Sequence, residues 1–366
     1  MIILKKKNRR VFYIAIMLAT ALALSACGDE AGSADDKEVD VVLVTDYGTI
    51  DDNLYNQAAW NGMKKYAEEA GLSYDYYQPQ DTDNDSIMAQ IKRGYSNGAK
   101  LFVCPGTMLE VPVYNAMKKY KKASFILVDG TPHNEDNTET EIRDNVSVIT
   151  FSEEQAGFLA GYSAVRDGYK GLGFVGGMPI DPVIRFGYGF VQGADYAAIE
   201  MGVNVHLRYT YTNTFSEDEL IEDLAATWYD DDTEVIFACG GAIGKSVIRA
   251  AETHNGKVIG VDVDESGESE TVITSAMKSV ESAVYEDVKS FFEGTFAGGT
   301  ETNMTAKRNG IMLPMETSRF EKFDKDSYDA IYSHLADGLI VPYNGTDIAT
   351  CDELTLVNTE VTFIPF

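Results

Sequence analysis

A glycine-rich octet in the second half of the chain has the outline of a phosphate-binding loop. It reads Cys239-Gly240-Gly241-Ala242-Ile243-Gly244-Lys245-Ser246 and follows an apolar run. In phosphate-binding loops, glycines let backbone N–H groups cradle phosphate oxygens while the lysine contacts them. The position of the first glycine is occupied here by Cys239. We therefore expect only a glycine-rich turn, at which a helix N-terminus comes close to a neutral ligand or to backbone.

Two further patterns lack a residue or a setting that their chemistry requires. Gly171–Gly176 matches a dinucleotide-binding fingerprint, but its glycines lie inside and at the end of a predicted strand. Asp81 and Asp262 each open a run like a calcium loop, whose twelfth residue should be a bidentate glutamate. That position is Lys92 in one run and Ile273 in the other. Because the four histidines are also scattered, we expect neither a bound metal nor a cofactor.

The segment Asp46-Tyr47-Gly48-Thr49-Ile50-Asp51-Asp52 is similar to the calcium-binding aspartate motif of nucleoside hydrolases. The leading aspartate of that motif is Val44 here, and one residue too many separates Gly48 from Asp51. Without a complete carboxylate cage, no metal ion is held to activate water. We therefore expect that the protein is not an enzyme, with nucleoside hydrolysis as the weaker alternative.

These segments lie on a repeating series of apolar and amphipathic runs. Val39–Thr45 is nearly continuously apolar, as in a parallel strand covered on both faces, and Asn56–Gly71 follows with helical spacing. The alternation continues with strands expected at 99–104, 124–129, 171–175, 203–211, 235–239 and 257–261, and helices at 111–122, 153–165, 185–201, 217–228 and 244–253. This pattern is typical of an α/β protein with doubly wound parallel sheets flanked by helices.

So many strand–helix units would overload one sheet, so the chain is expected to form two α/β lobes. Ligands of such sheets bind beyond the C-terminal ends of the strands. The residues that follow the predicted strands are Asp46, 104–107, Asp129, 176–186, 212–215, 240–244 and Asp262.

The N-terminus has the features of a bacterial lipoprotein signal peptide. Five basic residues precede the uncharged run Val11–Leu24, which is too short to span a bilayer as a helix. The run ends in Leu24-Ser25-Ala26-Cys27, which resembles a lipobox. We predict a signal peptide over 1–26, lipid on Cys27 and a flexible linker over 27–38. The mature protein would then be anchored to the cell membrane on its extracytoplasmic face.

The charge of the chain excludes one class of partner and disfavours another. The 366 residues include 58 acidic and 30 basic residues, for a formal net charge of −28, and 45% are hydrophobic. Without the five basic residues of the predicted signal peptide, 25 remain against the same 58, a net charge of −33. Nucleic-acid binding requires a basic face, so it is not expected. Long-range repulsion also disfavours phosphorylated solutes.

Several blocks along the chain resemble, in the same order, the BMP family of extracytoplasmic lipoproteins, which are PnrA-like nucleoside-binding proteins of ABC importers. The first block is Asp46–Gly62, and further blocks span 151–161, 174–178, 186–193, 258–264 and 274–278. Two departures stand out. Asn53-Leu54-Tyr55-Asn56 replaces the usual Lys-Ser-Phe-Asn, and Glu265 follows the second aspartate of Val261-Asp262-Val263-Asp264, where the family has glutamine. No family counterpart can be placed for 345–366.

The resemblance implies a two-lobed, type I periplasmic-binding-protein-like fold, whose chain crosses between lobes near 150, 270 and 300. The first lobe would comprise 39–150 and about 271–300, and the second 151–270 and about 301–366. A solute would bind between the lobes and pass to an ABC permease after closure. The protein is expected to be monomeric.

A nucleoside site needs an aromatic ring on each face of the base, since base–aromatic stacking contributes about 1–3 kcal/mol per base. Tyr55 and Phe186 are expected to form this pair, with Phe215 as the rival for the second place. The resemblance also implies that Asp46 and Asn56 contact the edge of the base. Core packing of the aromatic residues and turn capping by Asp46 are the structural alternatives.

The ribose of a nucleoside offers two vicinal hydroxyl groups, which one carboxylate can accept together. Asp262 is the expected acceptor, while Lys278 donates to ribose oxygens and holds Asp262 ionised. A plain ion pair between the two is the alternative. We expect capture of a neutral nucleoside, with a purine favoured over a pyrimidine. A sugar or riboflavin-like solute, or a role as antigen or sensor without transport, stays open.

Overall fold

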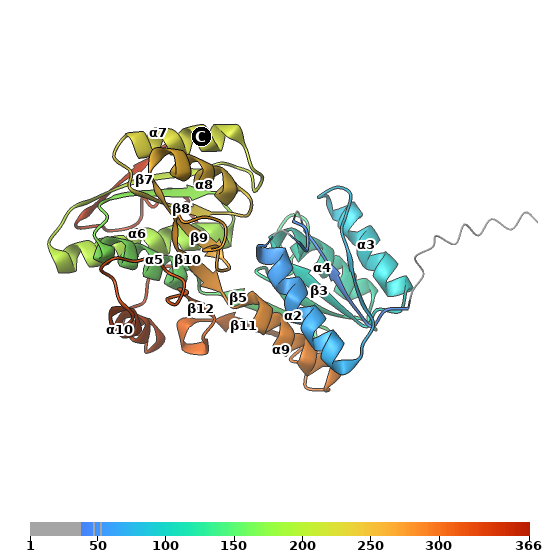
Figure 1. Ribbon diagram of the computed structural model, residues 1–366. Helices are drawn as coiled ribbons and strands as arrows, with labels where there is room; N and C mark the ends of the chain where they lie inside the picture. Colours follow the sequence, from blue (N-terminus) through green and yellow to red (C-terminus); the bar gives the residue numbers. More distant parts are fainter. Residues whose placement is uncertain (1–37, 47, 52) are drawn as a thin grey trace, which may run out of the picture. The chain divides into compact units, whose positions relative to one another are not determined.

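The computed structural model describes residues 38–46, 48–51 and 53–366 (Figure 1). The predicted signal peptide and Cys27 lie outside these residues. Within them, no helix is both long and apolar enough to cross a membrane. Val39–Phe366 form one unit that contains two sheets.

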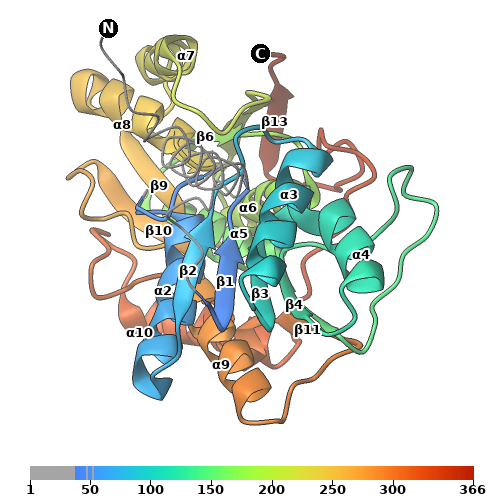
Figure 2. The ribbon, with the colours of Figure 1, turned by 90° about the vertical axis from the view of Figure 1, so that its right-hand side faces the viewer.

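The first sheet has six strands, all parallel, in the order β11-β5-β4-β3-β1-β2. Figure 2 shows β2, β1, β3, β4 and β11 side by side in this order. The strands are β1 (Val41–Val44), β2 (Tyr74–Tyr77), β3 (Leu101–Pro105), β4 (Ser124–Val128), β5 (Val146–Phe151) and β11 (Thr300–Met304). With the helices α2 (Tyr55–Ala70), α3 (Asn84–Ser96), α4 (Glu110–Lys119) and α9 (Val280–Phe292), they make up the first lobe.

The second sheet has seven strands in the order β12-β10-β9-β8-β6-β7-β13, parallel except for the pair β10 and β12. The strands are β6 (Gly171–Gly176), β7 (Val205–Tyr211), β8 (Val235–Cys239), β9 (Lys257–Asp262), β10 (Val272–Lys278), β12 (Ile311–Met312) and β13 (Thr359–Phe363). The helices of this second lobe are α5 (Glu153–Asp167), α6 (Asp181–Met201), α7 (Glu219–Asp230), α8 (Ile243–His254) and α10 (Lys325–Ala336).

Helices cover both faces of each sheet, which explains the nearly continuous apolar character of the central strands. In the first sheet, Val42 and Val44 pack with residues of α3 and α4, whereas Val41 and Leu43 pack with residues of α2. In the second, α7 and α8 lie on one face and α5 and α6 on the other (Figure 1). The predicted fold class is confirmed.

Glycines let α5 and α6 pack backbone against backbone. A Cβ atom on Gly157 or Gly161 would lie 2.0 Å from the carbonyl oxygen of Phe186 or Phe190. Such contacts require residues without side chains at both crossing points. These contacts hold α6 against α5 at Phe186 and Phe190. Helix α6 begins at Asp181, four residues before the predicted start, with a proline at its first turn.

The chain crosses between the lobes at 152, 279 and 305–310, each time directly after a strand. The predicted boundaries put about 271–300 in the first lobe and about 301–366 in the second. Instead, β10 pairs with β9 in the second sheet, and β11 pairs with β5 in the first. The reason is that the buried strand β10 follows β9 after a short connection and completes the sheet beside it before the chain crosses.

Candidate functional site

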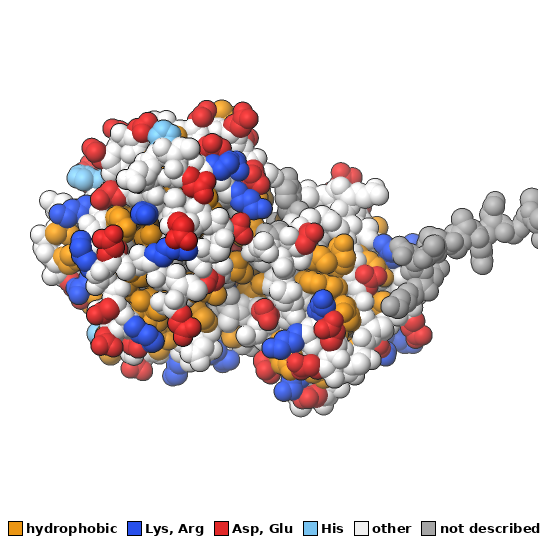
Figure 3. All heavy atoms as spheres, in the orientation of Figure 1, with side chains coloured by type: hydrophobic (Ala, Val, Ile, Leu, Met, Phe, Trp, Pro, Cys, Tyr) orange, Lys and Arg blue, Asp and Glu red, His pale blue; other side chains and the backbone are white. Residues whose placement is uncertain are grey.

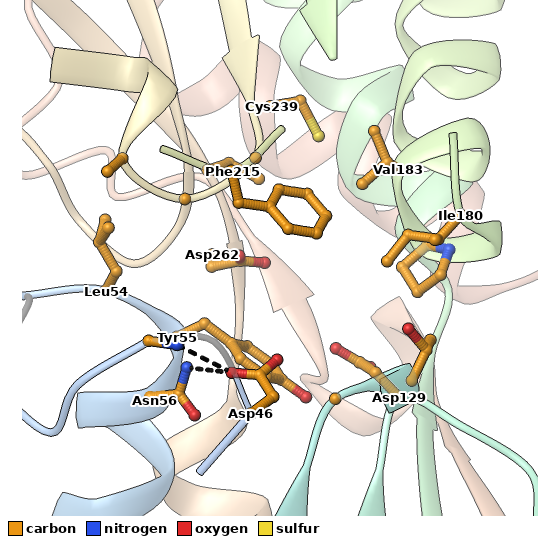
Figure 4. A pocket seen from close by; sticks show the side chains of 18 of the residues that line it. Asp46, Leu54, Tyr55, Asn56, Asp129, Ile180, Val183, Phe215, Cys239 and Asp262 are labelled. Carbon is orange, nitrogen blue, oxygen red and sulfur yellow. Dashed lines mark hydrogen bonds between the residues drawn. The ribbon is translucent and has the colours of Figure 1, made fainter. Parts of the chain in front are cut away.

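A cavity of about 390 Å³ lies beyond the C-terminal ends of strands from both sheets (Figure 4). All seven predicted site residues line it, namely Asp46, Tyr55, Asn56, Phe186, Phe215, Asp262 and Lys278. They are brought together because parallel strands present their C-terminal ends at one edge of each sheet. The glycine-rich turn at 240–241 lines the same cavity, along with Lys245.

Asp46, at the end of β1, anchors the wall of the first lobe. Its Oδ1 accepts hydrogen bonds from the backbone N–H of Gly48, at 3.1 Å, and from Nδ2 of Asn56, at 2.8 Å (Figure 4). Its Oδ2 lies 2.4 Å from where a Cβ atom on Gly106 would be, so that position requires glycine. Asp46 therefore caps a turn, as the structural alternative proposed, and also orients Asn56 toward the cavity.

Tyr55 is the first residue of α2 and contributes the aromatic surface of this wall. Its hydroxyl group donates to the carbonyl oxygen of Val128, at the end of β4, over 3.2 Å. Burial, together with the charges of Asp129 and Asp46, raises the pKa of Tyr55 above its ordinary value. The phenol is therefore neutral, its hydroxyl group is held by this hydrogen bond, and its ring lines the cavity.

Lys278, at the end of β10, is the centre of a buried charge cluster. Its ammonium group contacts Asp129, and lies 3.2 Å from Oδ1 of Asp262 and 3.7 Å from Oε1 of Glu153. Burial opposes its charge, but these carboxylates raise the pKa of Lys278 above its ordinary value. Since Asp129 lies in the first lobe and Asp262 in the second, the lysine links both lobes where the chain crosses between them.

The two aspartates that contact Lys278 occupy matching places in the two sheets. Asp129 directly follows β4 and Asp262 ends β9, and both have positive φ, 60° and 65°. Aspartate tolerates this conformation better than most residues, and it turns the side chain away from the strand direction. Burial raises the pKa of Asp262, with Lys278 opposing and Asp129 reinforcing this shift. The lysine acts in the predicted direction, but burial outweighs it.

Glu153 of α5 and Arg185 of α6 form an ion pair next to Lys278. The carboxylate of Glu153 is fully buried and accepts from Nε of Arg185 at 2.7 Å. Burial raises the pKa of Glu153, while Arg185 and Lys278 lower it. Arg185 immediately precedes Phe186 in α6, so the same helix turn supplies both the support and part of the cavity wall.

The two candidate aromatic residues of the second lobe differ in exposure. Phe186 is only 2% exposed, and its ring meets that of Phe237 edge to face at 5.9 Å between centroids. Phe215 is half-buried, and its ring projects into the cavity above Asp262 (Figure 4). The absence of side chains at Gly177 and Gly240 makes room for this ring. Phe186 thus behaves largely as a core residue, whereas Phe215 presents its ring to the cavity.

The candidate site predicted from the sequence does not include Asp129, Glu153 and Arg185. Asp129 carried a usable signal, because it lies at the end of a predicted strand. Glu153 and Arg185 are ordinary charged residues near the start of helices. Only the packing of α5 against α6, with Lys278 beyond them, shows that they form one cluster.

Comparison with known proteins identifies the family of this chain. Residues 39–344 match the Bmp family, described as "ABC transporter substrate-binding protein PnrA-like". The chain belongs to the Bmp family. Members of this family are substrate-binding proteins of ABC transporters, so the resemblance stated from the sequence is confirmed. The match ends before β13, which adds a strand to the edge of the second sheet.

Named relatives agree with this assignment, and a solved structure has a similar fold. The chain is 27% identical to the ABC transporter nucleoside-binding protein BmpA of Lactococcus lactis subsp. cremoris, covering 91% of this chain and 98% of that protein. It is 26% identical to an uncharacterized lipoprotein of Pyrococcus abyssi, over 84% and 77% of the two chains. The crystal structure of an ABC transporter solute-binding protein from Aeropyrum pernix K1 superposes with a TM-score of 0.73, at 22% identity over 86% and 95%.

Proposed function

We propose that this Bmp-family protein captures a nucleoside, with a purine favoured, and delivers it to an ABC permease. The family assignment supports the role in solute capture, and the name of the Lactococcus relative supports the class of solute. We further propose that the mature protein is a monomer held on the extracytoplasmic face of the membrane by lipid on Cys27. The lipobox-like sequence and the lipoprotein name of the Pyrococcus relative support this anchor.

The observation that carries the nucleoside proposal is that one cavity is lined by two aromatic rings and by two groups of polar side chains. Tyr55 of the first lobe and Phe215 of the second both line it, and each offers a flat apolar surface (Figure 4). A base between them would gain about 1–3 kcal/mol from each stacking contact. We therefore assign the second stacking role to Phe215 and a supporting role to Phe186.

Polar groups next to the rings match the two ends of a nucleoside. Asp46 and Asn56 are hydrogen-bonded to each other, and together they offer an acceptor and a donor to the edge of a base. Asp262 and Asp129 offer carboxylate oxygens for vicinal hydroxyl groups, and Lys278 offers ammonium protons. Oδ1 of Asp129 is buried and forms no hydrogen bond within the described part of the chain, so a ligand hydroxyl would satisfy it.

The acidity of the protein favours an uncharged ligand. Acidic side chains are spread over the face shown in Figure 3. At the end of the cavity near Lys278, its ammonium group already faces three carboxylates, which leaves little positive potential there for a phosphate. A neutral nucleoside avoids this repulsion.

Isothermal titration calorimetry of the purified mature protein tests the proposal. Inosine, guanosine, adenosine, uridine and cytidine would be titrated separately, with D-ribose and riboflavin as competing solute classes. We expect binding of at least one purine nucleoside with a Kd of 1 μM or tighter, equivalent to about −8 kcal/mol. Binding of ribose or riboflavin, with no binding of any of the nucleosides, would refute the proposal. Free base in the incubated sample, seen by chromatography, would show hydrolysis instead of capture.

A further inference from the structure

The loop that follows Asp262 contains a buried glutamate, Glu265. Asp262 ends β9, and this loop connects it to β10. The backbone N–H of Glu265 donates to Oγ of Ser275, on β10, at 3.0 Å. The backbone N–H of Val263 donates to the carbonyl oxygen of Val261 at 2.7 Å. These contacts tie the loop to both strands.

The side chain of Glu265 fills a space that a glycine leaves open. A Cβ atom on Gly260 of β9 would lie 2.2 Å from Oε2 of Glu265, so the carboxyl group packs directly on the backbone of that strand. The N-terminal turn of α8 closes the space from the other side, since a Cβ atom on Gly244 would lie 3.8 Å from Oε1. As a result, Glu265 is only 5% exposed.

No cation within the described part of the chain forms an ion pair with this carboxyl group, and its Oε2 forms no hydrogen bond there. The charged and titratable groups that act on it come from every neighbouring element. They are Asp262 on β9, Lys245 on α8, Glu268 in the loop and Cys239 on β8. Burial and the negative charge of Asp262 raise the pKa of Glu265 to about 8, although the backbone of Val261 and Lys245 oppose the shift.

We propose that Glu265 is a positioning residue that holds the Asp262 loop in its binding geometry only while its carboxyl group is neutral. A neutral carboxylic acid has nearly the shape of an amide and fits this space without a counter-ion. Ionisation of Glu265 would place a second negative charge next to that of Asp262. The carboxylate would then be more stable in water than in this buried space, and the loop would move with it. The inference rests on the proposed function, because Asp262 is assigned there to the ribose.

The binding test compares the wild type with Glu265→Gln and with Glu268→Gln, a matched change at an exposed position of the same loop. Affinity for adenosine, whose base does not titrate near pH 8, would be measured by calorimetry at pH 7 and pH 9.5. With a pKa of about 8 for Glu265, we expect the wild type and Glu268→Gln to lose about 30-fold in affinity at the higher pH, as linkage to one proton predicts. Glu265→Gln should bind as the wild type does at pH 7 and keep that affinity at pH 9.5.

Three results would overturn the proposal: an unchanged wild-type affinity at pH 9.5, a parallel loss in Glu265→Gln, or a large loss in Glu265→Gln already at pH 7. Lys278 and Tyr55 do not mimic the effect, because the pKa of each lies above its ordinary value.

A second measurement needs no ligand and separates this inference from the proposed function. Because the pKa of Glu265 is raised on folding, the wild type should be about as stable as Glu265→Gln at low pH and should lose stability relative to it as pH rises toward 8. The Tm of the wild type should therefore fall further and further below that of Glu265→Gln from pH 5 to pH 8. A constant Tm difference would refute the proposal that Glu265 holds its proton in the folded protein. If the Tm difference widens and no nucleoside binds, only the proposed function fails.

Discussion

At the scale of single residues, exposure separates the two phenylalanines that the sequence could not rank. Phe215 presents its ring to the cavity, whereas Phe186 is packed against Phe237. We expect Phe215→Ala to weaken nucleoside binding by about 1–3 kcal/mol, the value of one stacking contact, at nearly unchanged stability. Phe186→Ala should instead lower the free energy of unfolding by about 3–5 kcal/mol. Calorimetry and urea denaturation of both variants measure the contrast, and the reverse pattern would return the stacking role to Phe186.

Lys278 is the cation that the carboxylates of the buried cluster share. Its replacement by methionine leaves Asp129, Asp262 and Glu153 without their shared cation. Breaking a buried pair in this way costs about 3–5 kcal/mol of unfolding free energy. Lys325→Met is the control, because its ion pair with Asp329 is exposed and contributes about 0.3–0.5 kcal/mol. Equal losses of unfolding free energy in the two variants, measured by urea denaturation, would show that the buried ion pairs contribute no more to stability than the exposed one.

At the scale of elements, the crossing of α5 and α6 positions one wall of the cavity. A Cβ atom on Gly157 would lie 2.0 Å from the carbonyl oxygen of Phe186, so Gly157→Ala must push the helices apart. We expect a loss of about 1–3 kcal/mol in stability, from overpacking, and weaker ligand binding as Arg185 and Phe186 move with α6. Gly267→Ala, at a position with no neighbouring atom within 4 Å, should change neither property. Thermal unfolding and calorimetry would show whether only the first variant is affected.

The C-terminal strand β13 lies outside the family match, and it extends the second sheet without contributing to the cavity. It pairs with β7, and the carboxylate of Asp195 accepts from the backbone N–H groups of Val357 and Asn358. No residue after 344 lines the cavity. A chain that ends at 344 should therefore have a lower Tm but retain its ligand affinity, as seen by thermal unfolding and calorimetry. Lost affinity in a folded truncated protein would contradict this view.

At the scale of the whole molecule, buried acidic groups make stability depend on pH. Burial and the neighbouring charge of Glu153 raise the pKa of Glu154 to about 7, and burial with the charge of Asp262 raises the pKa of Glu265 to about 8. Groups whose pKa is raised on folding stabilise the protein at low pH and lose that contribution as pH rises through the folded pKa. We expect the Tm of the ligand-free protein to fall between pH 5 and pH 8. Glu154→Gln should reduce this fall, and a Tm that rises over the range would contradict the assignment.

The sequence by itself determined the fold class, the family and seven of the residues that line the cavity. Strand and helix periodicity is local, and ligands of parallel sheets bind where the strands end, so Asp46 and Asp262 could be selected in advance. Short motifs in the same order as in the family then pointed to Lys278 and Phe186. Each of these signals depends on near neighbours in the chain.

Only the tertiary structure decided which of those residues face the cavity and what supports them. The side of α6 that faces the core is set by the glycine contacts with α5, and this buries Phe186. Asp129, Glu153 and Lys278 lie far apart in sequence and meet only because the chain crosses between the lobes there. The raised pKa of Glu265 likewise follows from its burial against Gly260 and from the nearby charge of Asp262. Burial and charge pairing arise from contacts between distant segments, which no local pattern encodes.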